Sequence, residues 1–240
     1  MQDKQAVLHK VKEQLALDFG CNPDAFDKQA NTIILTEDKD FFRIATFGKG
    51  AVIRADKSIY QWCLDNLLDQ ESMDILDGSV LFNLEAKLRE HGKQLAGSQE
   101  RYLFFPQDVK LHIPKDYQIK WFEADQIPSL YPDKRFKNAL AYKPKDVLAV
   151  VALDGDEITA MAGAGNYKKE MWQIGIDTMP AYREKGFAAY LVNLLATEIC
   201  RRGFIPYYTT WSANLPSTWV ALKSGFLPAW IEYYAKDTSS

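Results

Sequence analysis

Arg183, Gly186 and Ala188 are the residues whose types and spacing carry the clearest chemistry in this chain. They follow a strand-like run that ends before Pro180, and they precede an apolar helical stripe. The first N–H groups of a helix have no acceptor inside it, and the helix dipole adds positive charge there. Because Gly186 also lets a phosphate approach the backbone closely, this order of strand, turn and helix predicts a cradle for a pyrophosphate.

A second motif downstream makes the short pattern Arg-x-x-Gly-x-Ala more specific. The segment NLPSTWVALKSGF contains Asn214, Ser217, Gly225 and Phe226. Together, the two motifs resemble those of the GCN5-related N-acetyltransferase (GNAT) superfamily. The family's pattern is roughly V-x-P-x-x-R-x-x-G-x-G/A, followed by a strand and N-x-x-A/S-(x)7-G-F.

The resemblance implies an acetyltransferase that uses acetyl-CoA as its cosubstrate. It implies that the main chain of Ile176, Asp177 and Thr178 binds the pantetheine arm. Ser217 is a further predicted cosubstrate-binding residue, in a short helix that begins at Asn214. Asn214 either caps that helix or contacts pantetheine. The backbone amides that would bind the pyrophosphate belong to Glu184, Lys185, Gly186, Phe187, Ala188 and Ala189.

Arg183 and Lys185 have two interpretations. Their positive charges either lie near the phosphates or belong to solvated residues of the first helical turn.

The reaction implied is direct attack of an amine on the thioester. An alkylamine is almost fully protonated at neutral pH, so a carboxylate that accepts its proton would help. In histone-type members a glutamate lies eleven residues before the first Arg or Gln of the motif, and that position is Trp172 here. Our candidate base is Glu170, on the same face of the strand, although an exposed hairpin charge is the simpler interpretation. Asp177 is a second candidate on the opposite face.

The family's usual general acid is also replaced. Many members carry a tyrosine seven residues after the helix-starting asparagine, and this chain has Ala221 there. Tyr207, Tyr208 and Ser217 are alternative proton donors, and the sequence does not select one of them.

These replacements leave three functions open. The first is an N-acetyltransferase that acts on the amine of a small molecule. The second is a non-catalytic acyl-CoA-binding sensor or interaction module, and the third is an acetyltransferase that modifies proteins.

The whole chain has the composition of an ordinary globular protein, with 47% hydrophobic and 25% charged residues and a net charge of −3. It has no apolar run long enough to span a membrane and no signal-like start, so we expect a cytoplasmic protein without a membrane partner. The mildly acidic balance argues against nucleic acid as a partner. Cys21, Cys63 and Cys200 are predicted to be reduced structural thiols, and the scattered histidines indicate no metal site.

Hydrophobic periodicity predicts an α/β (α+β) protein. In the first half we expect helices at 4–18, 59–68 and 80–88 and strands at 32–35, 41–47 and 51–54. In the second half we expect strands at 118–122, 147–153, 157–165, 171–178, 205–211 and 230–235, a broken helical region at 125–141, and helices at 184–202 and 215–224. The resemblance implies that the second half is a GNAT fold, with a mixed, mostly antiparallel central sheet flanked by helices.

We expect two domains: an N-terminal α/β domain of uncertain role at 1–115 and the GNAT domain at 116–240. The segment FRIATFGKGAVIRAD, together with WQIGIDTMPAYREKG in the second half, also resembles a branch of two-part bacterial GNAT proteins that includes a zwittermicin-resistance acetyltransferase. That resemblance implies that the first half shapes the acceptor site. The loop Gly48-Lys49-Gly50 is then either an acceptor or cofactor contact or a plain hairpin turn.

Overall fold

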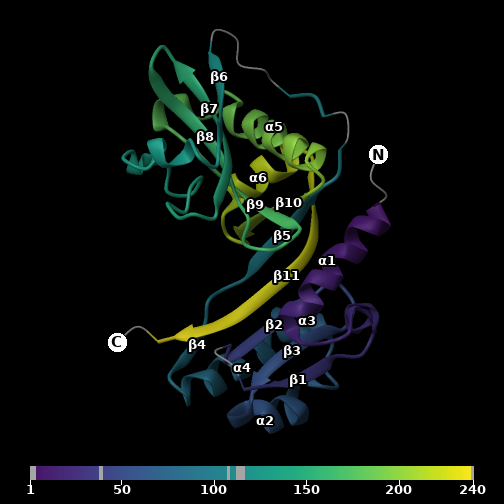
Figure 1. Cartoon of the computed structure of the whole chain (residues 1–240). Coiled ribbons are helices and arrows are strands. Elements are labelled where there is room, and N and C mark those ends of the chain that lie inside the picture. Colours follow the sequence, from purple (N-terminus) through teal and green to yellow (C-terminus); the bar gives the residue numbers. More distant parts are fainter. Residues whose placement is uncertain (1–3, 38–39, 107–108, 112–116, 239–240) are drawn as a thin grey trace. The chain divides into compact units, whose positions relative to one another are not determined.

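The computed structural model of the chain describes residues 4–37, 40–106, 109–111 and 117–238. The chain divides into two compact units (Figure 1). Of the described residues, the first unit comprises Lys4 and those of 102–228, and the second comprises those of 5–101 and 229–238. The predicted boundary at 115/116 falls within 112–116, outside the described residues, so that boundary stays a prediction.

The second unit combines helices with a small sheet. Its strand order is β1-β3-β2-β11, with β1 parallel to β3, and with β2 antiparallel to both β3 and β11. The short strand β4 pairs with β11 in antiparallel fashion. Its elements are α1 (Lys4–Phe19), η1 (Pro23–Asp27), β1 (Thr32–Thr36), β2 (Phe42–Thr46), β3 (Ala51–Asp56), α2 (Lys57–Leu67), α3 (Ser72–Leu76), α4 (Ser79–Arg89), β4 (Lys93–Leu95) and most of β11 (Phe226–Asp237).

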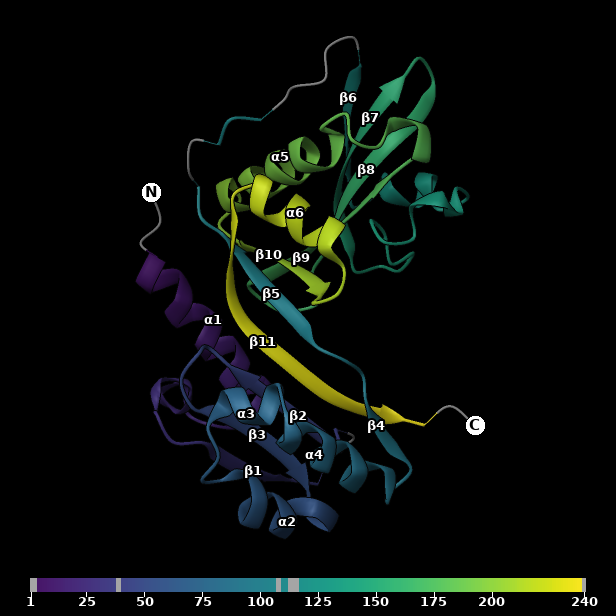
Figure 2. The same cartoon turned by 180° about the vertical axis from the view of Figure 1, so that it is seen from behind.

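The first unit is built around a sheet with the order β5-β10-β9-β8-β7-β6. Strands β6 to β9 pair antiparallel with their neighbours, and β10 runs parallel to β9. Helices flank this mixed, mostly antiparallel sheet, which confirms the predicted fold class (Figure 2). Its elements are the second half of β5 (Gln99–Phe104), β6 (Gln118–Glu123), η2 (Ile127–Leu130), η3 (Lys134–Phe136), β7 (Asp146–Asp154), β8 (Glu157–Gly165), β9 (Met171–Thr178), η4 (Pro180–Tyr182), α5 (Phe187–Arg201), β10 (Ile205–Trp211) and α6 (Leu215–Lys223).

The two faces of this sheet bury different partners, as the alternation of side chains in β7 requires. On one face Leu148 and Val150 join a core that includes Leu191 and Leu195 of α5. On the other face Ala149 and Val151 pack with a cluster that contains Phe136 and other residues of 127–143, the stretch that includes η2 and η3 and is called the η2–η3 segment. The sheet of the first unit is therefore covered by α5 on one side and by the η2–η3 segment on the other.

The helical region expected at 125–141 is the largest difference from the sequence analysis. The structure has only two short 3-10 turns there, η2 and η3. Pro128 and Pro132 lack the N–H groups that a continuous α-helix would need. Asp133 starts a new turn instead, with its side chain accepting a hydrogen bond from the Arg135 N–H.

Candidate active site

The turn from β9 into α5 has an unusual backbone. Glu184 and Gly186 have φ angles of 63° and 87°, in the left-handed region that favours glycine. A non-glycine residue there is strained by roughly 1–2 kcal/mol, and such strain gathers at functional sites. These two conformations also explain why α5 begins at Phe187, whereas the sequence analysis expected position 184.

The start of α5 has no side-chain cap. The N-cap residue is Gly186, which has no side chain to accept from the first N–H groups of the helix. The first helical hydrogen bond runs from the Tyr190 N–H to the Gly186 carbonyl. The N–H groups of Phe187, Ala188 and Ala189 precede this first helical bond. They are the donors that an anion could accept from.

The predicted positive charges lie beside this turn. The Arg183 Nε donates to the Thr178 carbonyl at 3.4 Å, and the Lys185 Nζ lies 4.8 Å from the centre of the Tyr182 ring. Both side chains are therefore tethered near the end of β9, within reach of an anion at the turn. Phe187 is buried, so only its backbone can take part.

Strands β9 and β10 separate before they end. Their parallel pairing runs from Met171 opposite Ile205 to Ile174 opposite Tyr208, whereas β9 continues to Thr178 and β10 to Trp211. On its other edge β9 stays paired with β8 through Thr178. The edge of β9 at 175–178 that faces β10 therefore has no strand partner among the described residues, as the resemblance requires of a pantetheine site.

The start of α6 lies near the point where the strands separate. The Asn214 side chain accepts a hydrogen bond from the Ser217 N–H at 3.3 Å, so it caps α6. Capping was one of the two roles predicted for Asn214. The Ser217 Oγ lies 2.8 Å from the Tyr208 hydroxyl oxygen. Tyr208 belongs to the last residue pair of β9 and β10, so α6 is connected to that point through two hydroxyl groups.

Two buried hydroxyl groups in this region lack a hydrogen-bond partner among the described residues. They are Oγ1 of Thr178, at the end of β9, and Oγ1 of Thr218, in the first turn of α6. A buried polar atom without a partner is costly unless a ligand or water satisfies it. Together with the free edge of β9 and the uncapped start of α5, these atoms fit a ligand that carries a phosphate and amide groups.

Asp177 has a structural task that the sequence analysis did not foresee. Its carboxylate accepts hydrogen bonds from the backbone N–H groups of Asn138 and Ala139 at 2.7 and 2.9 Å, and from the Asn138 amide at 2.6 Å. These bonds fix the η2–η3 segment against the sheet.

Two glycines inside the strands were the sequence signal for this close approach. A Cβ at Gly175 would lie 1.9 Å from the Asn138 carbonyl oxygen, and one at Gly163 would lie 2.2 Å from the Ala139 carbonyl oxygen.

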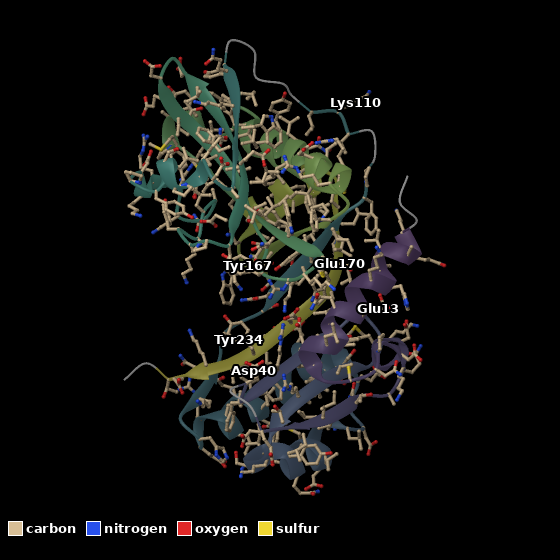
Figure 3. The ribbon with its side chains drawn as sticks, in the orientation of Figure 1. Glu13, Asp40, Lys110, Tyr167, Glu170 and Tyr234 are labelled. Atoms are coloured by element: carbon tan, nitrogen blue, oxygen red, sulfur yellow. The ribbon has the colours of Figure 1, made fainter. Side chains whose placement is uncertain are left out.

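Glu170 lies at the other end of β9, directly before its first residue, and is exposed (Figure 3). Its carbonyl accepts a hydrogen bond from the Ile205 N–H. Glu170 lies four positions before Ile174, which is about 13 Å along a strand. The structure thus does not bring Glu170 to the point where β9 and β10 separate, and its role as a base stays a prediction.

The positions of the two missing family residues are filled by core side chains. Trp172 stacks on Phe204 with ring centres 4.3 Å apart, and Ala221 is fully buried. The three cysteines are free, and burial raises the pKa of Cys63 to about 12 and that of Cys200 to about 11. Thiols with such pKa values are weak nucleophiles at neutral pH.

The family model for GNAT acetyltransferases matches residues 91–230, which is more than half of the chain. The chain belongs to the GNAT acetyltransferase family. As a member of that family it is an N-acetyltransferase, and GNAT acetyltransferases use acetyl-CoA and an acceptor. No curated protein matches this GNAT acetyltransferase in sequence.

This GNAT acetyltransferase is similar to solved structures at low sequence identity. A Drosophila protein is 11% identical with a TM-score of 0.50, and the match covers 99% of this chain and 91% of that chain. A GCN5-related N-acetyltransferase-like protein of Streptococcus suis is 16% identical with a TM-score of 0.47, over 66% of this chain and 69% of that chain. The protein yncA of Salmonella typhimurium, described as an acetyltransferase, was solved with its cofactor acetyl-CoA; it is 13% identical with a TM-score of 0.38, over 52% and 96% of the two chains.

Two kinds of feature are absent from the described residues. The described residues contain no group of three or more His, Cys, Asp or Glu side chains that could hold a metal ion. No helix in that part of the chain combines the length and apolar character needed to cross a membrane.

Proposed function

We propose that this GNAT acetyltransferase binds acetyl-CoA along the free edge of β9 and transfers the acetyl group to a primary amine of a small molecule. The observation that carries the proposal is the separation of β9 from β10 next to an uncapped helix start. The separated edge offers main-chain groups to the two amides of pantetheine. The helix start offers N–H groups and a positive dipole to the pyrophosphate.

Each predicted residue has a place in this arrangement. Ile176, Asp177 and Thr178 bind pantetheine through their main chain, and the amides of residues 184–189 bind the pyrophosphate. Arg183 and Lys185 add positive charge beside it. Asn214 holds the start of α6 together through its cap. Ser217 faces the end of the bound arm through its hydroxyl.

A small acceptor is favoured by the cover on the sheet face opposite α5. The η2–η3 segment is fixed there by Asp177 and by Asp146, whose carboxylate accepts hydrogen bonds from the Ala141 and Lys143 N–H groups at 2.9 and 3.1 Å. A segment held by several such bonds moves little. It leaves less room for a polypeptide acceptor than for a small amine.

Transfer proceeds by direct attack of the neutral amine on the thioester carbonyl carbon. The weakly acidic cysteines argue against a covalent acetyl-cysteine on the enzyme. Glu170 is the proposed base; because it lies about 13 Å along the strand from Ile174, the amine proton would reach it only through a chain of several waters. Residues of the first unit thus supply both the cosubstrate site and the proposed base.

Calorimetry with acetyl-CoA, followed by a thiol-release assay with a panel of amines, tests the proposal. We expect saturable acetyl-CoA binding and turnover with at least one small amine. The panel includes zwittermicin, because the relation of this chain to the zwittermicin-resistance branch stays a prediction. Absence of acetyl-CoA binding would contradict the whole proposal. Binding without turnover of any amine would indicate the non-catalytic module, and turnover only with lysine-containing peptides would indicate a protein-modifying enzyme.

A further inference from the structure

The hydroxyl of Tyr208 occupies a distinctive place in the first unit. Tyr208 lies opposite Ile174 in the last residue pair before β9 and β10 separate. Its side chain is almost fully buried, and its ring packs 5.9 Å from that of Phe226. A phenol in such a core needs a hydrogen-bond partner, and here that partner is the Ser217 hydroxyl at 2.8 Å.

The hydroxyl pair is held in place by α6. The Ser217 backbone N–H donates to the Asn214 side chain, so the first turn of α6 fixes the position of the serine. A serine hydroxyl has one proton and two acceptor sites, which lets it donate to the Tyr208 oxygen or accept from it. Tyr208 can therefore lose or regain a proton while its oxygen keeps a partner.

The length of the β9 edge relates this pair to the thioester. From the turn after Thr178 back to Ile174 the strand extends about 13 Å, at about 3.3 Å per residue. An extended pantetheine arm, with two amides between phosphate and sulfur, spans a similar distance. With the pyrophosphate at residues 184–189 and the arm along β9, the sulfur would then lie near the pair of Ile174 and Tyr208.

We propose that Tyr208 is the catalytic residue that donates a proton to the leaving sulfur of CoA, with Ser217 as its positioning residue. This inference rests on the proposed function. The amine nitrogen forms a bond to the acetyl carbonyl carbon and loses a proton to the base, the carbon–sulfur bond breaks, and its electron pair goes to sulfur. The sulfur takes the proton of the Tyr208 hydroxyl, and the phenolate regains one from solvent through Ser217.

The surroundings of Tyr208 keep its proton available at neutral pH. Burial raises the pKa of the phenol, and the negative charge of Asp177 raises it further, while the hydrogen bond with Ser217 acts in the opposite direction. The same burial disfavours a free thiolate and so raises the pKa of the CoA thiol. The pKa values of phenol and thiol are therefore closer than in water, which favours proton transfer from Tyr208 to the sulfur.

Two other tyrosine positions fit this task less well. Tyr207 is the neighbouring residue of β10, so its side chain points to the opposite face, and its hydroxyl donates to the Gln173 side chain at 3.2 Å. Position 221, where the family resemblance implies a tyrosine, is a buried alanine in the same core as Tyr208. The proposed proton donor thus comes from β10, and the small Ala221 side chain in α6 leaves room for the Tyr208 ring.

The test measures the thiol pKa of bound CoA, which needs no acceptor. Free CoA is titrated in complex with the wild-type protein and with Tyr208→Phe, and the ultraviolet absorbance of the thiolate is followed against pH. We expect the pKa of the bound thiol to rise by about one to two units in Tyr208→Phe, because a hydrogen bond to a charged group contributes that much. With an active amine, kcat should also fall at least tenfold while the acetyl-CoA Kd changes little.

Tyr207→Phe is the matched variant, with the same substitution at the next residue. An unchanged thiol pKa in Tyr208→Phe, or a rise in Tyr207→Phe alone, would overturn the proposal while leaving acetyl-CoA binding intact. If Tyr208→Phe does not fold, Ser217→Ala takes its place, and a smaller rise in the same direction is expected. No rise in that variant would also overturn it. Failure of the wild-type protein to bind CoA would instead contradict the proposed function.

Discussion

Asp177 illustrates, at the scale of single residues, how contacts decide what a carboxylate can do. Its three hydrogen bonds to Asn138 and Ala139 occupy both oxygens and leave little capacity for a proton from an amine. The sequence analysis named it both as a main-chain contact for pantetheine and as a second candidate base. Its side-chain partners favour the main-chain role.

We expect Asp177→Asn to lower the free energy of unfolding by about 1–3 kcal/mol, because an amide cannot accept all three bonds. The acetyl-CoA Kd should stay within about threefold, since only the backbone of residue 177 is proposed to touch the ligand. Urea unfolding and calorimetry measure the two effects. A large loss of affinity without a loss of stability would show that the side chain itself binds the ligand.

Glu170 is tested by its kinetics at two pH values. If it is the base, Glu170→Gln should lower kcat/KM by about 10²–10⁴ at neutral pH. The loss should shrink at alkaline pH, where the amine loses its proton without help. A loss below about tenfold at neutral pH would remove Glu170 from the mechanism, and Asp156→Asn, in the turn between β7 and β8, is a charge-matched control.

At the scale of elements, the turn between β9 and α5 is the feature on which cosubstrate binding depends. Its left-handed residues Glu184 and Gly186 come directly before a helix start that has no side-chain cap. The sequence showed the glycine of this turn. It gave no indication that Glu184 shares the left-handed conformation.

We expect Gly186→Ala to raise the acetyl-CoA Kd at least tenfold and to lower stability by about 1–2 kcal/mol, because Ala disfavours the left-handed region. Gly203→Ala is the matched control. Gly203 follows α5 with the same φ of 87° and with open space where a Cβ would lie. It should cost similar stability and leave the Kd unchanged, so equal effects on Kd in both variants would contradict the cradle.

At the scale of the whole molecule, the second unit has a buried ionic network of its own. The Glu232 carboxylate accepts from Arg43 at 2.8 Å and from the Trp230 indole at 2.6 Å, and Arg101 lies 3.6 Å away. Burial alone would raise the pKa of Glu232, but the charges of Arg101 and Arg43 and these hydrogen bonds outweigh it and lower the pKa to about 2.

This network predicts how stability depends on pH. Because the pKa of Glu232 is lower in the folded state, its contribution is present above about pH 4.5 and is lost as the pH falls toward 2; by linkage it is on the order of 3 kcal/mol. Urea unfolding between pH 2.5 and 7 measures it, with Glu232→Gln as reference. We expect that variant to be less stable at pH 7 by about 3–5 kcal/mol and to show a weaker pH dependence. Parallel pH profiles of the two proteins would contradict the assignment.

Acetyl-CoA should protect only part of the molecule from hydrogen exchange. We expect slower exchange in the amides of 175–178, 184–190 and 214–218 and no change in the helices of the second unit, since ligand binding stabilises the segments it contacts. Protection confined to the second unit would contradict the proposed site.

Hydrophobic periodicity and glycine positions are local properties, so the order of amino acids was enough to predict most strands, the long helices and the strand–turn–helix motif, although it missed β4 and β5. The family could also be predicted, through two motifs whose spacing survives in the chain. Spacing cannot express where β9 and β10 separate, that Asn138 and Ala139 occupy Asp177, or that Tyr208 meets Ser217 at the separation point. These are contacts between residues distant along the chain, and only the packing of strands and helices brings such residues together.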